Sequence, residues 1–475
     1  MAIAGKTLKF SEILSALPPS PETSLIGEIR GQVERNGKKI VMLDDDPTGT
    51  QTVHDTPVLT DWSISSLTQI FAEPGLLFCI LTNSRSLSAE VASRLMIEII
   101  QNLDEVSAQL GIGYVLISRS DSTLRGHFDE ETTAIMDTIG HPIDGVILVP
   151  FFEEGGRYTL NDVHYVREGD ALIPVSETEF AGDKTFGYHS SNLREWVQEK
   201  TRMRISPSEV CSISLEDLRL DGLERVTAKL LALRQRQVCI VNVVNYTDLE
   251  ILVLSLLKAE EEGRHFLYRT AASFVRVRAG LPPQGLWNPE KLIGKPELSG
   301  GLIVAGSHVQ KSTLQLKMLM KLNNLFSIEV VVDRLLIPDE RAGVIKATAA
   351  AADAHLLQGE DVLIFTSRQL ISSDQPEESL RIGQAVSSAL VDIVGLVQTR
   401  PAWIVTKGGI TSSDIATRAL GIRRASVLGQ IEQGVPVWLT PTTSRWKNLI
   451  LVIFPGNVGD IDALTRTVEK LRFRL

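Results

Sequence analysis

Cysteine is scarce in this chain of 475 residues, and its three copies, Cys79, Cys211 and Cys239, lie far apart in the sequence. An odd number of widely spaced cysteines, mostly within apolar runs, favours reduced packing residues over a disulfide framework or a zinc site. The chain also lacks an apolar run of about 18 residues, and its first 20 residues lack a basic segment followed by an apolar one. We therefore expect a cytoplasmic protein that does not insert into a membrane.

Positive charge is in deficit as well. The 48 lysines and arginines face 58 aspartates and glutamates, a net charge of −10, which disfavours binding to nucleic acid or to anionic membranes. A small-molecule partner is the expectation that remains. Hydrophobic residues at 43% and charged residues at 22% are typical of a globular chain and exclude a disordered or fibrous one. At about 150 residues per domain, the length predicts two or three domains.

Short runs rich in valine, isoleucine and leucine alternate with longer segments of helical period. This alternation is typical of parallel strands whose two faces are covered by helices, and it predicts two α/β domains with largely parallel sheets. Residues 279–301 contain four prolines and several glycines, so we place the boundary between residues 285 and 286. The predicted strands are 39–43, 76–81, 114–118, 145–149 and 238–243, then 302–305, 328–332, 362–366, 403–406 and 449–454.

Three acidic residues, Asp44, Asp45 and Asp46, follow the first predicted strand directly. Open α/β sheets bind ligands at the carboxyl ends of their strands, where carboxylates can bind substrate hydroxyls, coordinate Mg²⁺ or accept a proton. The alternative is a turn or a helix cap. Three adjacent carboxylates repel one another, however, and a turn needs only one, so we favour the functional interpretation.

A second polar segment, residues 118–127, also follows a predicted strand. Its arginines, Arg119 and Arg125, can hold a carboxylate or phosphate, while Asp121 and Ser122 can hold hydroxyl groups. A helix cap would explain one or two of these residues, but not two arginines that flank an aspartate. Arg85 follows a third strand and is expected at the same edge of the sheet.

Three glycine-containing loops follow strands in the second half. The segment that begins Gly306-Ser307 is not a Walker loop, because Ala305 and Gln310 stand where that pattern needs glycine. Gly408 and Gly409 can let the backbone approach a ligand before a helix begins, and Gly456 lies in the third loop. Each loop alone is a weak signal, but three loops on one sheet edge favour a nucleotide site.

Together these segments resemble the four-carbon acid sugar kinase family. The resemblance covers most of the chain in order, through residues 44–49, 120–126, 156–157, 161–162, 178–183, 306–307, 408–412 and 456–459. It implies a sugar-acid binding domain over residues 1–285, a nucleotide-binding domain over residues 286–475, and an active site in the cleft between them. The implied substrate is a sugar acid such as threonate, erythronate or a 3-oxo-tetronate, with ATP and Mg²⁺ as cofactors.

The resemblance also implies roles for single residues. The catalytic candidates are Asp45 and Asp121, either of which could accept the hydroxyl proton. The substrate-binding candidates are Asp44, Arg85, Ser122 and Arg125, and the nucleotide-binding candidates are Ser307, Gly408, Gly409, Ile410, Thr411 and Gly456. The metal ligands and the number of subunits stay open, with a homodimer as one arrangement. Arg119 stands where the family often has lysine, and residues 44–62 and 151–186 are longer than usual, which predicts a subgroup with its own substrate.

Two other functions compete with this one. The pattern Asp44-x-Asp46-x-Thr48 matches haloacid-dehalogenase-like phosphatases, in which Asp44 would be the nucleophile and Asp46 the acid and base. That interpretation leaves the 121–125 segment and the glycine loops without a role. A non-catalytic sensor of two lobes would bind the sugar acid without turning over ATP.

Overall fold

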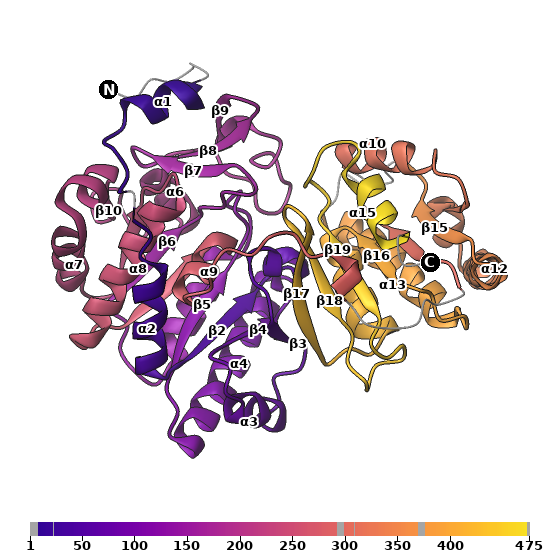
Figure 1. Cartoon of the computed structure of the whole chain (residues 1–475), viewed down its shortest axis with the longest axis horizontal. Coiled ribbons are helices and arrows are strands. Elements are labelled where there is room, and N and C mark those ends of the chain that lie inside the picture. The colour runs from indigo at the N-terminus through magenta and orange to yellow at the C-terminus, as the bar shows by residue number, and fades with distance from the viewer. Residues whose placement is uncertain (1–7, 22, 292–298, 308, 369–375, 473–475) are drawn as a thin grey trace. The chain divides into compact units, whose positions relative to one another are not determined.

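The computed structural model describes residues 8–21, 23–291, 299–307, 309–368 and 376–472. The chain divides into two compact units (Figure 1). Unit 1 comprises Met1–Asp45 and Trp62–Pro283, and unit 2 comprises Asp46–Asp61 and Gln284–Leu475. A segment of the first half, residues 46–61, therefore packs with the second half. The predicted functional boundary between residues 285 and 286 stays a prediction.

Unit 1 is built on a parallel sheet with the strand order β10-β11-β6-β12-β5-β2-β4. Its strands are buried on both faces, which is why they appear in the sequence as continuous apolar runs. The five predicted strands are confirmed. The bounds are β2 (Lys39–Asp44), β4 (Leu77–Leu81), β5 (Tyr114–Arg119), β6 (Gly145–Val149), β10 (Cys211–Ile213), β11 (Gln237–Val241) and β12 (Phe266–Thr270).

The sequence analysis did not predict β12. Its residues include Arg269, which breaks the apolar pattern although it is only 4% exposed. The structure buries this guanidinium by pairing it with Glu131 at 2.5 Å.

The helices of unit 1 are α1 (Phe10–Ala16), α2 (Ile26–Asn36), α3 (Ile64–Ala72), α4 (Ala89–Leu110), α5 (Phe128–Thr138), α6 (Leu193–Lys200), α7 (Gly222–Ala232), α8 (Tyr246–Glu261) and α9 (Ala272–Arg278).

A small antiparallel sheet with the order β1-β9-β8-β7 completes unit 1. Three of its strands come from the long polar segment after β6. Asn161 and Asp162, with φ values of 50° and 65°, form the two-residue turn between β7 and β8, as a tight hairpin requires. The strands are β1 (Leu8–Lys9), β7 (Arg157–Leu160), β8 (Val163–Glu168) and β9 (Ala171–Pro174).

Unit 2 has a mixed sheet with the order β3-β17-β18-β19-β16-β13-β15-β14. The five strands from β19 to β14 are parallel, and β3, β17 and β18 join antiparallel. The five predicted strands of this half are confirmed, whereas the β17–β18 hairpin and β3 were not predicted. The bounds are β3 (Thr56–Leu59), β13 (Leu302–Ala305), β14 (Leu325–Val330), β15 (Asp361–Thr366), β16 (Ile404–Lys407), β17 (Arg424–Glu432), β18 (Val435–Leu439) and β19 (Ile450–Phe454).

Helices α10 and α15 cover one face of this sheet, where Leu316 and Val468 pack in one apolar core with Trp403. The architecture confirms the predicted fold class, two α/β units with largely parallel sheets. Among the described residues no helix is both long enough and apolar enough to cross a membrane. The helices of unit 2 are α10 (Gln310–Leu319), α11 (Val332–Leu335), α12 (Pro338–Leu357), α13 (Pro376–Leu396), α14 (Gly409–Asp414) and α15 (Ala463–Arg472).

Candidate functional site

The carboxyl ends of β2 and β5 place acidic and basic groups side by side in unit 1. Asp44 and Arg119 are register partners on these strands, and their side chains form an ion pair at 3.0 Å (Arg119 Nη1 to Asp44 Oδ1). Both residues are almost fully buried, at 1% and 4% exposure. Asp44 is therefore enclosed by the sheet edge and is held by a guanidinium that the sheet register supplies.

Asp45 is the centre of a second set of contacts at the same edge. Arg85 donates two hydrogen bonds to its carboxylate, at 2.6 and 3.2 Å, and the Ser120 hydroxyl donates a third at 2.8 Å. Burial alone would raise the pKa of Asp45, but the charges of Arg85 and Arg119 outweigh it and hold that pKa below its usual value. The carboxylate is thus an ionised acceptor.

Arg269, on the neighbouring strand β12, contacts two of the serines at this edge. Its guanidinium donates to Ser120 Oγ at 2.8 Å and to Ser118 Oγ at 2.7 Å, so it orients the hydroxyl that reaches Asp45. The sequence analysis assigned no role to this residue, because a lone arginine inside an unpredicted strand gave no signal.

Asp121 and Arg125 form an ion pair in the turn that follows β5. Arg125 Nε lies 2.7 Å from Asp121 Oδ2, Arg85 Nη1 lies 4.0 Å from Asp121 Oδ1, and the Thr123 hydroxyl donates to the same carboxylate. Against the effect of burial, these partners hold the pKa of Asp121 far below its usual value. The structure thus brings Asp45, Asp121, Arg85 and Arg125 together, as predicted.

The polar segment after β6 folds over this turn. The ring centroid of Phe180 lies 5.1 Å from the guanidinium of Arg125 and 5.8 Å from that of Arg157. Cation–π attraction to this ring therefore stabilises both guanidinium groups. Asp183 Oδ2 lies 3.7 Å from Arg125 Nη1. Arg157 and Phe180 were part of the resemblance but had no assigned role, and their place beside Arg125 makes them further candidates for binding an anion.

Ser122 is buried in the same turn at 8% exposure. Its carbonyl accepts a hydrogen bond from His164 Nε2 at 2.8 Å, and Tyr188 donates its hydroxyl proton to the neighbouring carbonyl of Thr123 at 2.7 Å. Burial lowers the pKa of His164 to about 4, so the imidazole is neutral at pH 7. These bonds tie the long segment after β6 to the turn that carries Asp121.

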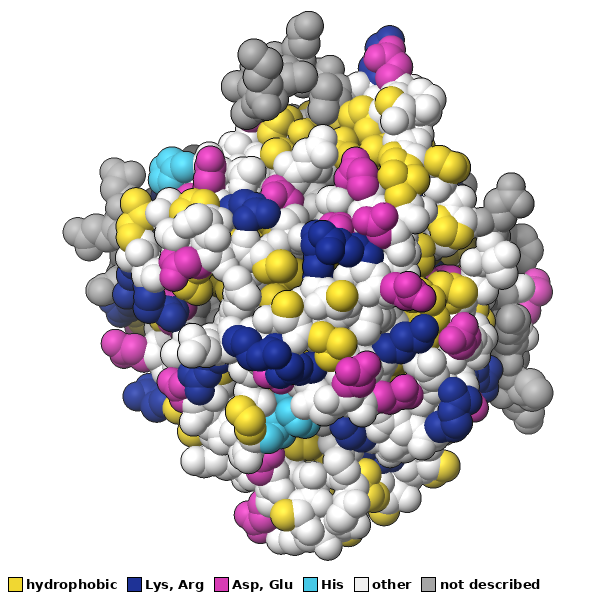
Figure 2. All heavy atoms as spheres, turned by 90° about the vertical axis from the view of Figure 1, so that its left-hand side faces the viewer, with side chains coloured by type: hydrophobic (Ala, Val, Ile, Leu, Met, Phe, Trp, Pro, Cys, Tyr) yellow, Lys and Arg dark blue, Asp and Glu magenta, His cyan; other side chains and the backbone are white. Residues whose placement is uncertain are grey.

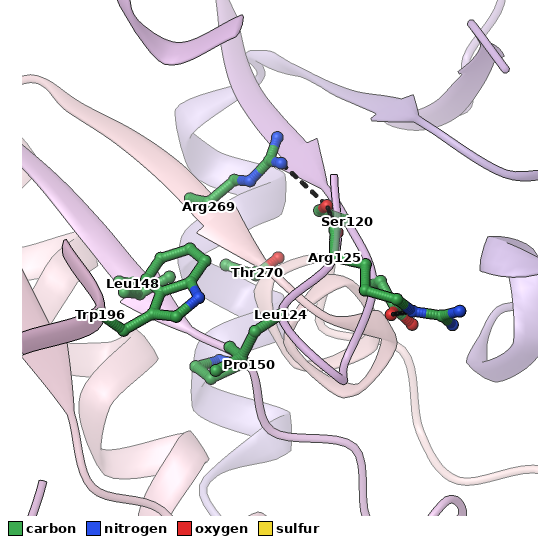
Figure 3. A pocket seen from close by; sticks show the side chains of 9 residues that line it. Ser120, Leu124, Arg125, Leu148, Pro150, Trp196, Arg269 and Thr270 are labelled. Carbon is green, nitrogen blue, oxygen red and sulfur yellow. Dashed lines mark hydrogen bonds and ion pairs between the residues drawn. The ribbon is translucent and has the colours of Figure 1, made fainter. Parts of the chain in front are cut away.

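A small cavity of about 20 Å³ lies behind the turn (Figure 3). Its wall is mostly apolar and includes Leu124, Leu148 and Trp196. In Figure 3, Arg269 reaches Ser120 from one side of the turn, while Arg125 extends from the other side and away from Trp196. The cavity has room for a water molecule but not for a sugar acid, so it belongs to the support of the turn.

Gly126 is the residue of the turn whose backbone is most constrained. Its φ is 122°, and a Cβ there would lie 2.8 Å from Ser120 Oγ and 3.1 Å from Asp45 Oδ2. We expect Gly126→Ala to lower the free energy of unfolding by about 1–3 kcal/mol, the usual range for such a backbone conformation, and to lower kcat by displacing Ser120 from Asp45. Chemical denaturation and a turnover assay check this.

Gly75→Ala is the matched control, because a Cβ at Gly75 meets nothing within 4 Å and its φ is ordinary. A Gly126→Ala protein as stable and as active as the Gly75→Ala protein would contradict the assigned role of the turn.

In unit 2 the three glycine loops follow the adjacent strands β13, β16 and β19 and meet around Ser307. A Cβ at Gly456 would lie 2.9 Å from Ser307 Oγ, and one at Gly408 would lie 3.2 Å from Ser307 Cβ. A Cβ at Gly306 would collide with the Thr411 hydroxyl. The loops therefore pack so closely that these positions have no room for a side chain, and the predicted gathering of the loops is present within unit 2.

Hydrogen bonds connect the three loops. Gly408 N donates to Phe454 O at 2.9 Å, and Ser312 Oγ, near the start of α10, donates to Ser307 Oγ and to Gly456 O at 3.0 Å each. Lys311 Nζ donates to Asn457 O at 3.2 Å. Ile410 lies beside the loops with its side chain 53% exposed. All of the predicted nucleotide-binding residues are therefore close neighbours.

Cationic side chains surround the loops, and the sequence analysis missed two of them. Lys407 is fully buried beneath the loops, where its ammonium donates to Pro455 O at 2.8 Å and lies 4.3 Å from the Phe454 ring centroid. Burial, and then the charges of Lys311 and Arg368, lower the pKa of Lys407 well below its usual value. Arg368 donates to the carbonyl of Ser307. The charges of Lys311 and Arg368 thus disfavour the charged form of Lys407, and a bound anion would offset this effect.

Asp46 belongs to unit 2, where it lies beside the glycine cluster. Its carboxylate accepts a hydrogen bond from Thr48 N at 2.8 Å and occupies the space beside Gly409, where a Cβ would lie 2.8 Å from Asp46 Cγ. Thr50, in the same segment, accepts a hydrogen bond from Trp438 Nε1 at 3.0 Å. The boundary between the units thus falls between two consecutive aspartates, Asp45 and Asp46.

The described residues contain no group of three or more His, Cys, Asp or Glu side chains placed to hold a metal ion. Mg²⁺ is commonly bound through one or two carboxylates together with substrate phosphates, so a magnesium–nucleotide complex at the glycine loops does not require such a group. The structure itself identifies no ligand for the ion.

Two family models match the chain. A sugar-binding N-terminal domain matches residues 40–278, and a nucleotide-binding C-terminal domain matches residues 302–464. No curated protein matches. Among solved structures, a Salmonella typhimurium LT2 protein named as a candidate tRNA synthase has a TM-score of 0.64 at 18% identity, over 90% of this chain and 98% of its own.

A Haemophilus influenzae protein assigned to the family DUF1537 has a TM-score of 0.59, also at 18% identity, over 92% of this chain and 100% of its own. At this identity the two likenesses show the fold alone. The family models add that the acidic edge with its arginines lies in the part that matches a sugar-binding domain, and the glycine cluster in the part that matches a nucleotide-binding domain.

Proposed function

The chain belongs to the four-carbon acid sugar kinase family, and we propose that it transfers the γ-phosphoryl group of ATP to a hydroxyl of a small sugar acid, most simply one of four carbons. The observation that carries the proposal is the separation of two complementary chemistries. Unit 1 presents buried carboxylates with arginines, and unit 2 presents closely packed glycine loops among cations.

The proposed sugar-acid site consists of Arg125 and the two ionised aspartates, Asp45 and Asp121. A guanidinium binds a carboxylate in a fixed planar geometry, so Arg125, supported by Phe180, is suited to the acid group of the substrate. Asp45 and Asp121 are both acceptors and can bind hydroxyl groups. One of them would receive the proton as the hydroxyl oxygen attacks phosphorus.

The proposed nucleotide site consists of the glycine loops around Ser307. Backbone N–H groups in glycine loops bind phosphate oxygens at short range because no side chain intervenes. Lys311, Lys407 and Arg368 would favour the accumulated negative charge of a triphosphate. ATP with Mg²⁺ supplies the phosphoryl group and part of its charge neutralisation, and the chain's own groups position it.

The phosphatase alternative is less well supported. Its nucleophile, Asp44, is 1% exposed and is paired with Arg119, whereas an attacking carboxylate must reach a phosphorus atom. Its acid and base, Asp46, belongs to the other unit. This interpretation also leaves the 121–125 segment and the glycine loops without a role, so we favour the kinase.

The direct test measures ADP release with a panel of four-carbon and related sugar acids. We expect turnover that depends on both ATP and one acid of the panel, with a phosphorylated acid as product. ATP hydrolysis without a phosphorylated acid, or release of phosphate from a phosphorylated acid, would contradict the proposal. Ligand binding without any turnover would instead support the two-lobed sensor.

The Arg125→Ala variant tests the proposed sugar-acid site separately from the proposed nucleotide site. We expect the KM for the acid to rise by about 30-fold or more, because loss of one partner of a hydrogen-bonded charge pair costs about 2 kcal/mol or more. The Kd for ATP should stay within about twofold of wild type, as measured by calorimetry, since unit 2 is unchanged. Arg125→Lys is the matched variant, which keeps the charge but loses the planar fork. Equal losses for acid and ATP would contradict the assignment.

A further inference from the structure

Two of the three cysteines are direct neighbours in unit 1. Cys211 on β10 and Cys239 on β11 are register partners in the parallel sheet, so their side chains leave the sheet on the same face. Neighbouring strands lie about 4.8 Å apart, and disulfides join Cα atoms about 4.4–6.8 Å apart. The backbone therefore already holds the two thiols within the range of a disulfide, although 27 residues separate them in the sequence.

The two thiols differ in their access to solvent. β10 is the edge strand of the sheet, and Cys211 is partly exposed, whereas Cys239 is fully buried. Figure 2 looks onto the side of unit 1 where β10 and α7 lie in Figure 1, and basic and acidic side chains are interspersed over it. A small reagent from solution would thus meet Cys211 first and Cys239 only through it.

Two cations flank Cys211. Lys229 Nζ donates to the carbonyl of Ser212 at 3.1 Å, and Arg194 Nη1 donates to that of Val210, so a cationic side chain contacts the residue on each side of Cys211. The Cys239 thiol and these two charges lower the pKa of Cys211 to about 7, against the effect of burial. The same contact, together with burial, raises the pKa of Cys239 well above its usual value.

We infer that Cys211 and Cys239 form a redox-active dithiol, in which Cys211 is the thiol that reacts with peroxide and Cys239 is the thiol that resolves the product. This inference goes beyond the proposed kinase and does not depend on it. It also changes the expectation from the sequence, in which the three cysteines are separate packing residues. All three are reduced in the structure, which is the state in which the reaction begins.

The reaction balances with hydrogen peroxide as the oxidant. The Cys211 thiolate attacks one peroxide oxygen, the O–O bond breaks, and hydroxide leaves and takes up a proton as water, so that Cys211 becomes a sulfenic acid. The Cys239 sulfur then loses its proton and displaces hydroxide from the Cys211 sulfur, which forms the S–S bond and a second water. Two thiols are oxidised to one disulfide while one peroxide is reduced to two waters.

The disulfide would act on a connected part of the fold. Ser212, beside Cys211, donates its hydroxyl proton to Asp162 Oδ1 at 2.5 Å, and Asn242 Nδ2, just after β11, donates to the same oxygen at 2.9 Å. Asp162 forms the turn between β7 and β8. Oxidation would thus join covalently the two strands that hold this turn, and would restrain the edge strand from opening.

Cys79 is an internal control. It lies within β4 with no exposed surface, its thiol is 4.0 Å from the sulfur of Met42, and burial raises its pKa well above the usual value. A reagent that reaches folded protein should therefore modify Cys211 and spare Cys79.

The test treats the full chain with one equivalent of hydrogen peroxide, alkylates the remaining thiols and maps non-reduced peptides by mass spectrometry. We expect an intramolecular Cys211–Cys239 disulfide, a loss of 2 Da, complete alkylation of Cys79 after unfolding, and full reversal by dithiothreitol. Iodoacetamide at pH 7 should modify Cys211 of the native protein at least about tenfold faster than Cys79.

Two variants separate the roles. Cys239→Ser should accumulate a sulfenic acid at Cys211 that dimedone traps, and Cys211→Ser should leave Cys239 unmodified at the same peroxide dose. Any other pattern in the folded wild-type protein would overturn the inference: no reaction, sulfinic acid at Cys211 without a disulfide, a disulfide between two chains, or oxidation of Cys79 at the same rate. Circular dichroism confirms that each variant is folded before its oxidation products are compared with those of the wild type.

Discussion

Replacing Asp121 with asparagine is expected to lower kcat by about 10²–10⁴-fold, the usual contribution of a general base. The amide keeps the shape of the side chain but cannot take the proton of the substrate hydroxyl. Arg125 and Arg85 keep the Asp121 carboxylate ionised in the wild type, so the variant removes both a charge and an acceptor. The Kd for ATP should change little, because the glycine cluster belongs to unit 2. Steady-state kinetics with saturating acid measures the effect.

Asp137→Asn is a suitable control for this substitution. Asp137 is an exposed aspartate of α5 that pairs with Arg236 at 2.5 Å, so the same chemical change there should leave kcat unaltered. If Asp121→Asn retains kcat while Asp45→Asn loses it, the proton acceptor is Asp45 and the role assigned to Asp121 is wrong. Thermal unfolding of each variant distinguishes loss of the acceptor from loss of the fold, since Asp45 also neutralises Arg85 and Arg119.

Replacing Gly409 with valine should raise the Kd for ATP by about 100-fold or more, a loss of about 2.7 kcal/mol of binding free energy. The new side chain must share the space that Asp46 occupies and would push this loop out of line with Ser307. Calorimetry with a non-hydrolysable ATP analogue measures the effect directly and needs no turnover. Binding of the sugar acid to the variant should be unchanged.

Gly343→Val provides the comparison within the same unit. A Cβ at Gly343 in α12 meets nothing within 4 Å, so this variant bears the same substitution without the crowding. An unchanged ATP affinity in folded Gly409→Val protein would remove the glycine cluster as the nucleotide site. Equal losses in both variants would mean that the effect is one of stability and not of the loop.

The strand ends and the residues that follow them could be predicted, because each depends on a short stretch of sequence. Asp45 lies just beyond β2, Arg125 follows β5 and Gly409 follows β16, and parallel strands bring such positions to one edge. The apolar runs identified the strands themselves because the strands are buried on both faces. Arg269 escaped prediction for the complementary reason: its burial depends on Glu131, which lies 138 residues away.

Other features depend on pairing that no local pattern encodes. Asp46 follows Asp45 directly, yet it packs in unit 2, because β3 pairs with β17 across more than 360 residues. Lys407 appears in the sequence as an ordinary lysine, and only the tertiary structure shows its buried ammonium donating to the loop that follows β19. Cys211 and Cys239 become neighbours only through the register of β10 against β11.

By itself the sequence determined the fold class, most of the central strands and the chemical character of the two sites, since periodicity and the groups at strand ends are local properties. The tertiary structure alone decided which charges neutralise one another, that Asp45 and Asp46 belong to different units, and that two distant thiols lie side by side. The physical reason is that a side chain's charge, burial and reactivity depend on neighbours in space, and strand order and register choose those neighbours.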